Sequence, residues 1–144
     1  MIYFDTAYLL KCYVAEPNCH FVRQLFRQHQ QVSSCEFAKI EFAAGIHRAV
    51  REGRLSEADV SVIQAQLQAD ASTGLLSWLP FNQSLVQSAQ SAFLSLDRNV
   101  FLRSGDAIHL ICACSHGFKE IHSNDQHLLR AAGHFGLLGV NVIP

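Results

Sequence analysis

Four acidic residues in this sequence are set among apolar residues instead of in charged segments. Asp5 follows the run MIYF, and Asp125 follows EIHSN. Glu41 lies in the segment KIEFAAG, and Asp106 opens the segment DAIHLICAC. Carboxylates that meet in a partly dry pocket repel one another unless one is protonated or a cation lies between them. Their oxygens favour Mg²⁺ or Mn²⁺, ions that activate water and stabilise charge during phosphodiester cleavage.

Two of these acids also have ordinary structural explanations. Asp106 at a helix start is stabilised by the helix dipole. Glu41 would suit an intrahelical ion pair, but the residues four positions away are Phe37 and Gly45, which carry no charge. Each acid alone therefore proves little, and the chemistry depends on whether the fold brings all four together.

The elements that must position the acids alternate along the chain. Short apolar strands are expected over residues 1–4, 31–33, 75–79, 120–123 and 138–143, and helices over 6–13, 19–30, 34–52, 56–71, 82–96, 104–117 and 124–132. This alternation predicts an α/β fold in which a central parallel sheet lies between helices. Because such sheets bind ligands at the carboxyl ends of their strands, Asp5 and Asp125 should point into the same crevice.

The composition describes one compact domain of residues 1–144, with 49% hydrophobic and 16% charged residues. The net charge is −1, but without the four acids eleven Lys and Arg face eight Asp and Glu (12 − 4), a balance of +3 that allows RNA binding. The five cysteines are odd in number and scattered, which suits reduced thiols. The apolar start is too short for a membrane span and no cleavage site follows it, so we expect a cytoplasmic protein.

The segments around the four acids resemble the acidic motifs of PIN-domain nucleases. In order, these segments are MIYFDTAYLLKCY, KIEFAAGIHRA, RSGDAIHLICA and IHSNDQHLL. More narrowly, they are similar to the VapC toxins of bacterial toxin–antitoxin pairs. The resemblance extends from Ile2 to Pro144. Each motif alone is weak, but the ordered set is fairly specific.

The resemblance implies a three-layer α/β/α PIN-like fold in which Asp5, Glu41, Asp106 and Asp125 are catalytic and bind Mg²⁺ or Mn²⁺. The implied activity is that of a metal-dependent endoribonuclease, which cleaves an RNA phosphodiester with a metal-activated water. The resemblance also implies a cognate antitoxin that places a basic side chain in the pocket, and a homodimer, whose surface we expect to include residues 56–71. The alternatives are a non-catalytic PIN-like module that binds RNA or protein, and a PIN nuclease with another nucleic-acid substrate.

Residues beside the acids either match the family pattern or depart from it. Thr6 and Ser123 match small hydroxyl residues that hydrogen-bond a carboxylate or a metal-bound water, although Thr6 is equally suited to cap a helix. Ser34 and Cys35 stand where the family often has a Thr-Ser pair, a change expected to alter only helix capping. Gly105 stands where leucine is common, and we expect it to loosen the helix start without removing a ligand.

Three basic residues lie close to the acids in the sequence. Lys11, Lys39 and Arg103 are therefore candidates for holding RNA phosphates, although a solvated surface position is the default interpretation of each.

The histidines suggest two other kinds of site. His109, Cys112 and His116 share one helix face, but the close ligand pairs of structural zinc sites are missing. A hydrogen-bonded core histidine is the better interpretation of His109. His122 and His127 flank Asp125, and a metal-independent mechanism with one of them as general base is an open alternative.

Overall fold

The computed structural model describes all residues 1–144 and contains five short strands and seven α-helices. The strands are β1 (Ile2–Tyr3), β2 (Val32–Cys35), β3 (Leu76–Leu79), β4 (Glu120–His122) and β5 (Leu138–Val140). The helices are α1 (Thr6–Tyr13), α2 (Cys19–Gln28), α3 (Ala38–Arg51), α4 (Glu57–Ser72), α5 (Gln83–Ser95), α6 (Ser104–Ser115) and α7 (Gln126–Ala131), followed by a 3₁₀ turn at Ala132–Phe135. No helix is both long and apolar enough to span a membrane.

All strand pairs are parallel, and β1 lies at the centre of the arrangement. Strands β1, β2 and β3 form one hydrogen-bonded sheet in that order, while β4 pairs with β5. A parallel bridge between Phe4 and His122 joins the two groups, and the Asp5 amide donates to the His122 carbonyl at 3.1 Å. The carboxyl ends of β1 and β4 therefore meet at one edge of the sheet, as the α/β prediction requires.

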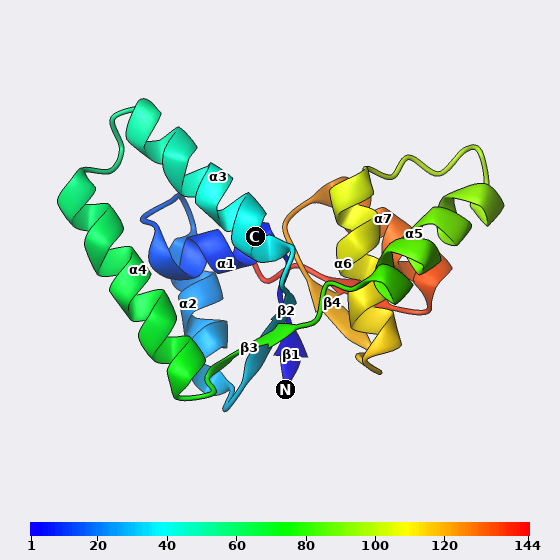
Figure 1. Cartoon of the computed structure of the whole chain (residues 1–144), viewed down its shortest axis with the longest axis horizontal. Coiled ribbons are helices and arrows are strands. Elements are labelled where there is room, and N and C mark those ends of the chain that lie inside the picture. The colour runs from blue at the N-terminus through cyan, green and yellow to red at the C-terminus, as the bar shows by residue number, and fades with distance from the viewer.

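The helices form layers on the two sides of the strands (Figure 1). Helices α1 to α4 lie on one side, and α5, α6 and α7 lie on the other. Two apolar cores fill the layers: Tyr3 belongs to the core under α6, whereas its neighbour Phe4 belongs to the core with Tyr8 and Phe42. Tyr3 of β1 and the next residue, Phe4, thus point to opposite faces, which is the normal alternation of extended chain. The predicted three-layer α/β/α fold is confirmed.

The predicted elements are all present, but several boundaries differ. Ser56 and Asp59 form the capping box at the start of α4. The predicted helix over 34–52 was wrong in its first turn, because Ser34 and Cys35 pair with Trp78 and Leu79 as part of β2. These two residues therefore do not cap α3. For these two residues, parallel pairing with β3 outweighs the helical pattern that follows them.

Candidate active site

Asp5 is placed by the end of β1 and the start of α1. Its side chain caps α1 by accepting a hydrogen bond from the Tyr8 amide at 2.9 Å, and it also accepts one from the Ser123 hydroxyl. Only 4% of the residue is exposed. Burial raises the pKa of Asp5 from 3.8 to about 6, although His109, Ser123 and the Tyr8 amide oppose this shift. The hydroxyl predicted at Ser123 thus does orient an acid.

Glu41 lies in the first turn of α3 and faces donors from two other helices. The Thr6 hydroxyl donates to its carboxylate, and Nε2 of His109 lies 2.9 Å from the same oxygen. Burial raises the pKa of Glu41, but these donors outweigh it, so that the pKa is lower than usual. On its other side His109 is hydrogen-bonded to the Tyr3 hydroxyl, with 2.9 Å between Nδ1 and the oxygen. Glu41 is therefore held in one orientation.

Asp106 and Asp125 share one cation. Asp106 lies in the first turn of α6, and Asp125 caps α7 by accepting from the His127 amide at 2.8 Å. The Arg103 guanidinium lies 3.0 Å from Asp106 and also pairs with Asp125. Burial raises the pKa of Asp125, but the α7 amides and Arg103 lower it overall. Arg103 therefore offsets the repulsion between these two carboxylates.

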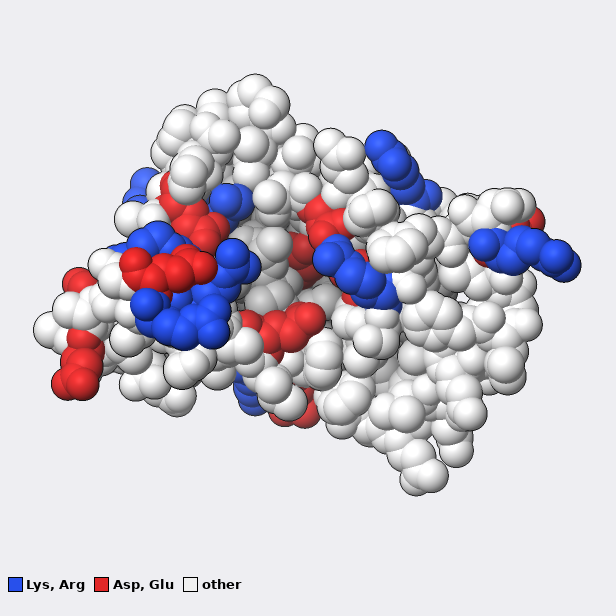
Figure 2. Space-filling view, turned by 90° about the horizontal axis from the view of Figure 1, so that it is seen from above, with Lys and Arg blue, Asp and Glu red and all other residues white.

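The structure brings the four carboxylates to one open cavity of about 610 Å³. Its acids come from the end of β1, from α3, from α6 and from the loop before α7, and Arg48 and Arg103 also line it. Seen from above, acidic side chains lie in a hollow and basic side chains lie on both sides of it (Figure 2). The arrangement can bind a cation among the acids and an anion at the rim.

Gly105 has a role that the sequence did not suggest. A Cβ atom built on Gly105 would lie 2.8 Å from a carboxylate oxygen of Glu41 and 3.6 Å from the Phe37 ring. A larger residue would therefore displace the Glu41 carboxylate. The expectation that Gly105 only loosens the start of α6 was incomplete, because this glycine makes room for one of the acids.

Two of the three predicted phosphate-binding residues do not line this cavity. Lys11 is buried, and its Nζ lies 3.2 Å from both Glu16 and the Pro17 carbonyl oxygen. Lys39 pairs with Glu36 at 3.4 Å and lies over the Trp78 ring. Sequence proximity to Asp5 and Glu41 was misleading, because both lysines point away to local partners.

His109 is the member of the site that sequence reasoning underrated. It is the buried, hydrogen-bonded core histidine that we expected, but its partners Thr6 and Glu41 line the cavity, as does His109 itself. The available signal was its position three residues after Asp106, which places both on one helix face. His116 instead bonds the Cys112 carbonyl one turn earlier, so these three residues form no zinc site.

The four acids have the right chemistry for a divalent cation but are not arranged as a finished cage. No three Asp, Glu, His or Cys side chains lie together in a geometry that would hold a metal ion. The reason is visible in their partners: Ser123 holds Asp5, His109 holds Glu41, and Arg103 lies between the other two acids. The oxygen donors fit Mg²⁺ or Mn²⁺. A cation bound by Asp106 and Asp125 would compete with the Arg103 guanidinium.

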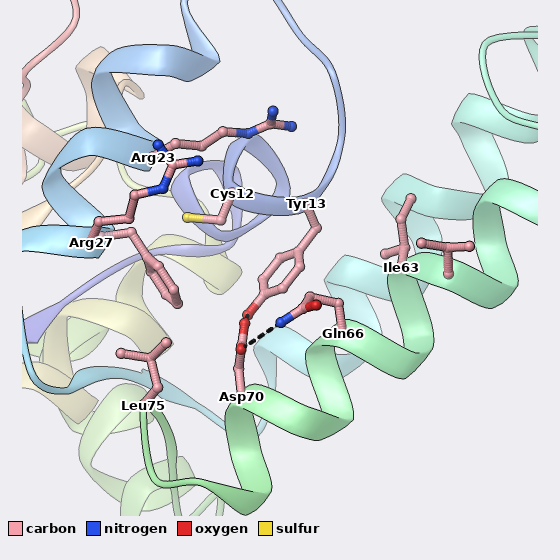
Figure 3. Close-up of a pocket in the computed structure, with 10 residues that line it drawn as sticks. Cys12, Tyr13, Arg23, Arg27, Ile63, Gln66, Asp70 and Leu75 are labelled. Carbon is pink, nitrogen blue, oxygen red and sulfur yellow. Dashed lines mark hydrogen bonds between the residues drawn. The ribbon is translucent and has the colours of Figure 1, made fainter.

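A second cavity, of about 560 Å³, lies between α1, α2 and α4 and has a different character. Its single acid is Asp70, which accepts from the Tyr13 hydroxyl and from Gln66, each at 2.8 Å (Figure 3). Arg23 and Arg27 also line it. One carboxylate with two neutral donors offers no set of metal ligands, so this cavity is not a hydrolytic centre.

Parallel strands between two helical layers, with acids at the carboxyl ends of β1 and β4, define the class of fold. The chain belongs to the PIN domain family, whose model matches residues 2–134. FitAcB from Neisseria gonorrhoeae is similar in structure, with a TM-score of 0.70 and 17% identity, over 99% of this chain and 98% of that one. A structure of FitAB bound to an IR36 DNA fragment gives a TM-score of 0.66 and 12% identity, over 99% and 95% of the chains. A search among functionally curated proteins found no significant match.

Proposed function

We propose that this PIN domain is a metal-dependent endoribonuclease and the toxin of a VapBC-like type II toxin–antitoxin system. PIN domains are generally nucleases, and this one retains an acid at each of the four motif positions. The observation that carries the proposal is the convergence of Asp5, Glu41, Asp106 and Asp125 on one cavity. Helix capping and hydrogen bonds account for single acids, but four carboxylates that converge on one cavity repel one another unless a cation compensates them.

In the proposed mechanism the acids bind Mg²⁺ or Mn²⁺. When bound, such an ion lowers the pKa of a water and neutralises charge on the phosphate. Ser123 and His109 hold Asp5 and Glu41 in place by the hydrogen bonds described above. Arg103 leaves Asp106 and Asp125, and its guanidinium then pairs with an RNA phosphate at the rim. Arg48, also on the cavity wall, would donate a second set of hydrogen bonds to the RNA phosphates.

The proposed partner is an antitoxin that inserts a basic side chain among the acids. The structural similarity to FitAcB and to DNA-bound FitAB supports such a partner. The cavity itself supports it as well, because Arg103 already shows that a guanidinium fits between Asp106 and Asp125. A homodimer and a cytoplasmic location belong to the same proposal.

Cleavage of RNA by the purified chain tests the nuclease proposal. We expect cleavage in Mg²⁺ or Mn²⁺ at roughly 5–10 mM and no cleavage in excess chelator. Cleavage should recover when the metal is restored. Glu41→Gln should lower the rate at least about 100-fold. Glu57→Gln is the matched control, because Glu57 is exposed at the start of α4 and outside the cavity.

The alternatives predict different results in the same assay. A non-catalytic PIN-like module would bind RNA without cutting it, with or without metal. A nuclease for another substrate would cut single-stranded DNA in preference to RNA. Cleavage that is unaffected by both the chelator and Glu41→Gln would overturn the metal-dependent mechanism and would favour a histidine base instead.

A further inference from the structure

Two exposed aromatic rings contact each other at an inclined angle on the surface. Phe101 lies in the loop before α6, and His127 lies in the first turn of α7. Their ring centroids are 4.5 Å apart with planes inclined by 55°. Phe101 is 60% exposed, and His127 is also exposed. This exposure leaves the Phe101 ring accessible to a ligand.

The ring pair is tied to the acids through both of its chain segments. Phe101 precedes Arg103 by two residues, and His127 follows Asp125 by two residues. Two residues of extended chain span at most about 7 Å. Without metal or RNA the ion pair between Arg103 and Asp125 holds the two segments together, and the contact between the two rings also joins them. The His127 amide donates to Asp125 at 2.8 Å. The rings therefore lie next to the segments that carry Arg103 and Asp125, two residues that line the acidic cavity.

Beside the rings is a separate hollow of about 310 Å³ that carries positive charge. Its wall includes Phe101 and His127, together with Arg130 and His134 from α7 and the turn after it. Arg130 has only a 3.3 Å hydrogen bond to Gln126, so its guanidinium keeps free donors. No acidic residue lines this hollow. The lining of this hollow is thus basic and aromatic, whereas the lining of the acidic cavity is rich in carboxylates.

We infer that Phe101 and His127 form a stacking platform for a nucleobase of single-stranded RNA that flanks the phosphate bound by Arg103 at the rim of the acidic cavity. Aromatic side chains bind unpaired bases by stacking, and neighbouring arginines bind the backbone between them. The exposed ring pair and the Arg130 guanidinium line one hollow, where they can bind a base and a phosphate of the strand that is cleaved at the acids. The inference rests on the proposed nuclease function and adds how the substrate is positioned.

Binding of a defined oligonucleotide tests the platform without requiring cleavage. The probe is a fluorescein-labelled RNA of about twelve uridines, roughly three times the length of the shortest sites of proteins that bind single strands. Its affinity for the protein is measured by fluorescence anisotropy in the Asp5→Asn background. We expect Phe101→Ala to weaken binding roughly 5- to 100-fold, the range of one lost base stack. Phe101→Tyr keeps the ring and should bind within about twofold of the parent.

Two controls separate stacking from other effects. Phe93→Ala removes another exposed phenylalanine, on α5 and away from both hollows, and should leave binding unchanged. An RNA of the same length in which the bases are replaced by abasic sites has nothing to stack. The loss caused by Phe101→Ala should therefore disappear with that probe.

The inference is overturned if Phe101→Ala binds oligouridine as the parent does, if it weakens the abasic probe equally, or if the parent does not bind oligouridine. These outcomes are distinct from a failure of the nuclease proposal. Cleavage by the wild type together with unchanged binding by Phe101→Ala would refute only the platform. Base-dependent binding through Phe101 without any cleavage would refute only the nuclease.

Discussion

The imidazole Nε2 of His109 on α6 lies 2.9 Å from a carboxylate oxygen of Glu41 on α3, across 68 residues of sequence. This contact joins the two helical layers at the acidic cavity, and the same ring reaches the Tyr3 hydroxyl in the core. One buried histidine thus connects the stability of the fold to the geometry of the site.

The first prediction concerns this histidine. His109→Ala removes a buried side chain and leaves the Tyr3 hydroxyl and the Glu41 carboxylate without their partner. We expect a loss of about 2–4 kcal/mol in the free energy of unfolding, measured by urea denaturation. His47→Ala, at an exposed position of α3, should change the value by less than about 0.5 kcal/mol. Equal stability of the two variants would contradict the role given to His109.

The second prediction concerns Gly105 and uses a matched glycine. Gly105→Ala places a methyl group 2.8 Å from the Glu41 carboxylate, whereas Gly133→Ala meets no atom within 4 Å. Because the displaced carboxylate is the end of a flexible side chain, the free energy of unfolding should change by less than about 1 kcal/mol. RNA cleavage should fall about tenfold or more in Gly105→Ala and stay unchanged in Gly133→Ala. Full activity of both variants would show that the position of Glu41 is unimportant.

The third prediction concerns the effect of pH on stability. Burial raises the pKa of Asp5 from 3.8 to about 6, so between these pH values the folded chain binds more protons than the unfolded chain. The contribution of Asp5 to stability should therefore fall as pH rises through this range, by about 3 kcal/mol. Burial opposes the charge on His109, but Glu41 and Asp5 raise the pKa of His109 above 6.5. The folded chain therefore loses stability at His109 as well when pH rises through that raised pKa.

Urea unfolding at a series of pH values between about 4 and 8 measures this dependence, and Asp5→Asn identifies its source. The variant cannot lose a proton at this position, so its profile should be flatter than that of the wild type. Parallel profiles for the two proteins would mean that Asp5 titrates normally in the folded chain.

The fourth prediction concerns the cation already present among the acids. Arg103→Gln removes the positive charge between Asp106 and Asp125, so the affinity for Mn²⁺ should rise. The increase in melting temperature on adding Mn²⁺ should therefore be larger in the variant. Without metal, Arg103→Gln should cost less than about 1 kcal/mol, because the side chain of Arg103 is 53% exposed.

Arg98→Gln is the control for this measurement, since Arg98 is exposed in the loop before α6 and has no ion pair in the structure. Its response to Mn²⁺ should equal that of the wild type. A smaller Mn²⁺ response in Arg103→Gln than in the wild type would refute the view that the guanidinium and the metal compete for the same acids.

Much of the fold and half of the site could be predicted from the sequence. Asp5 and Asp125 follow strand candidates, and the geometry of a parallel sheet brings such positions together. The positions of Glu41 and Asp106 needed the family resemblance, because an acid within a helix has several explanations.

The rest depended on tertiary contacts that local patterns do not contain. Lys11 was expected near phosphate, but its partner Glu16 is set by how the chain turns after α1. The contact between Gly105 and Glu41 joins residues of two helix layers. Ser34 and Cys35 were predicted as helix, because the residues that pair with them in the strand, Trp78 and Leu79, lie over 40 residues away in the sequence.

The central claim is that Asp5 and its three partners catalyse metal-dependent RNA cleavage. The most direct measurement compares the initial rates of the wild type, Asp5→Asn and Asp97→Asn on one RNA in Mg²⁺. Asp97 is exposed in a loop, where its side chain accepts a 2.8 Å hydrogen bond that asparagine can also accept. We predict a loss of at least about 100-fold for Asp5→Asn and an unchanged rate for Asp97→Asn. Equal rates for all three proteins, or no metal-dependent cleavage by the wild type, would contradict the claim.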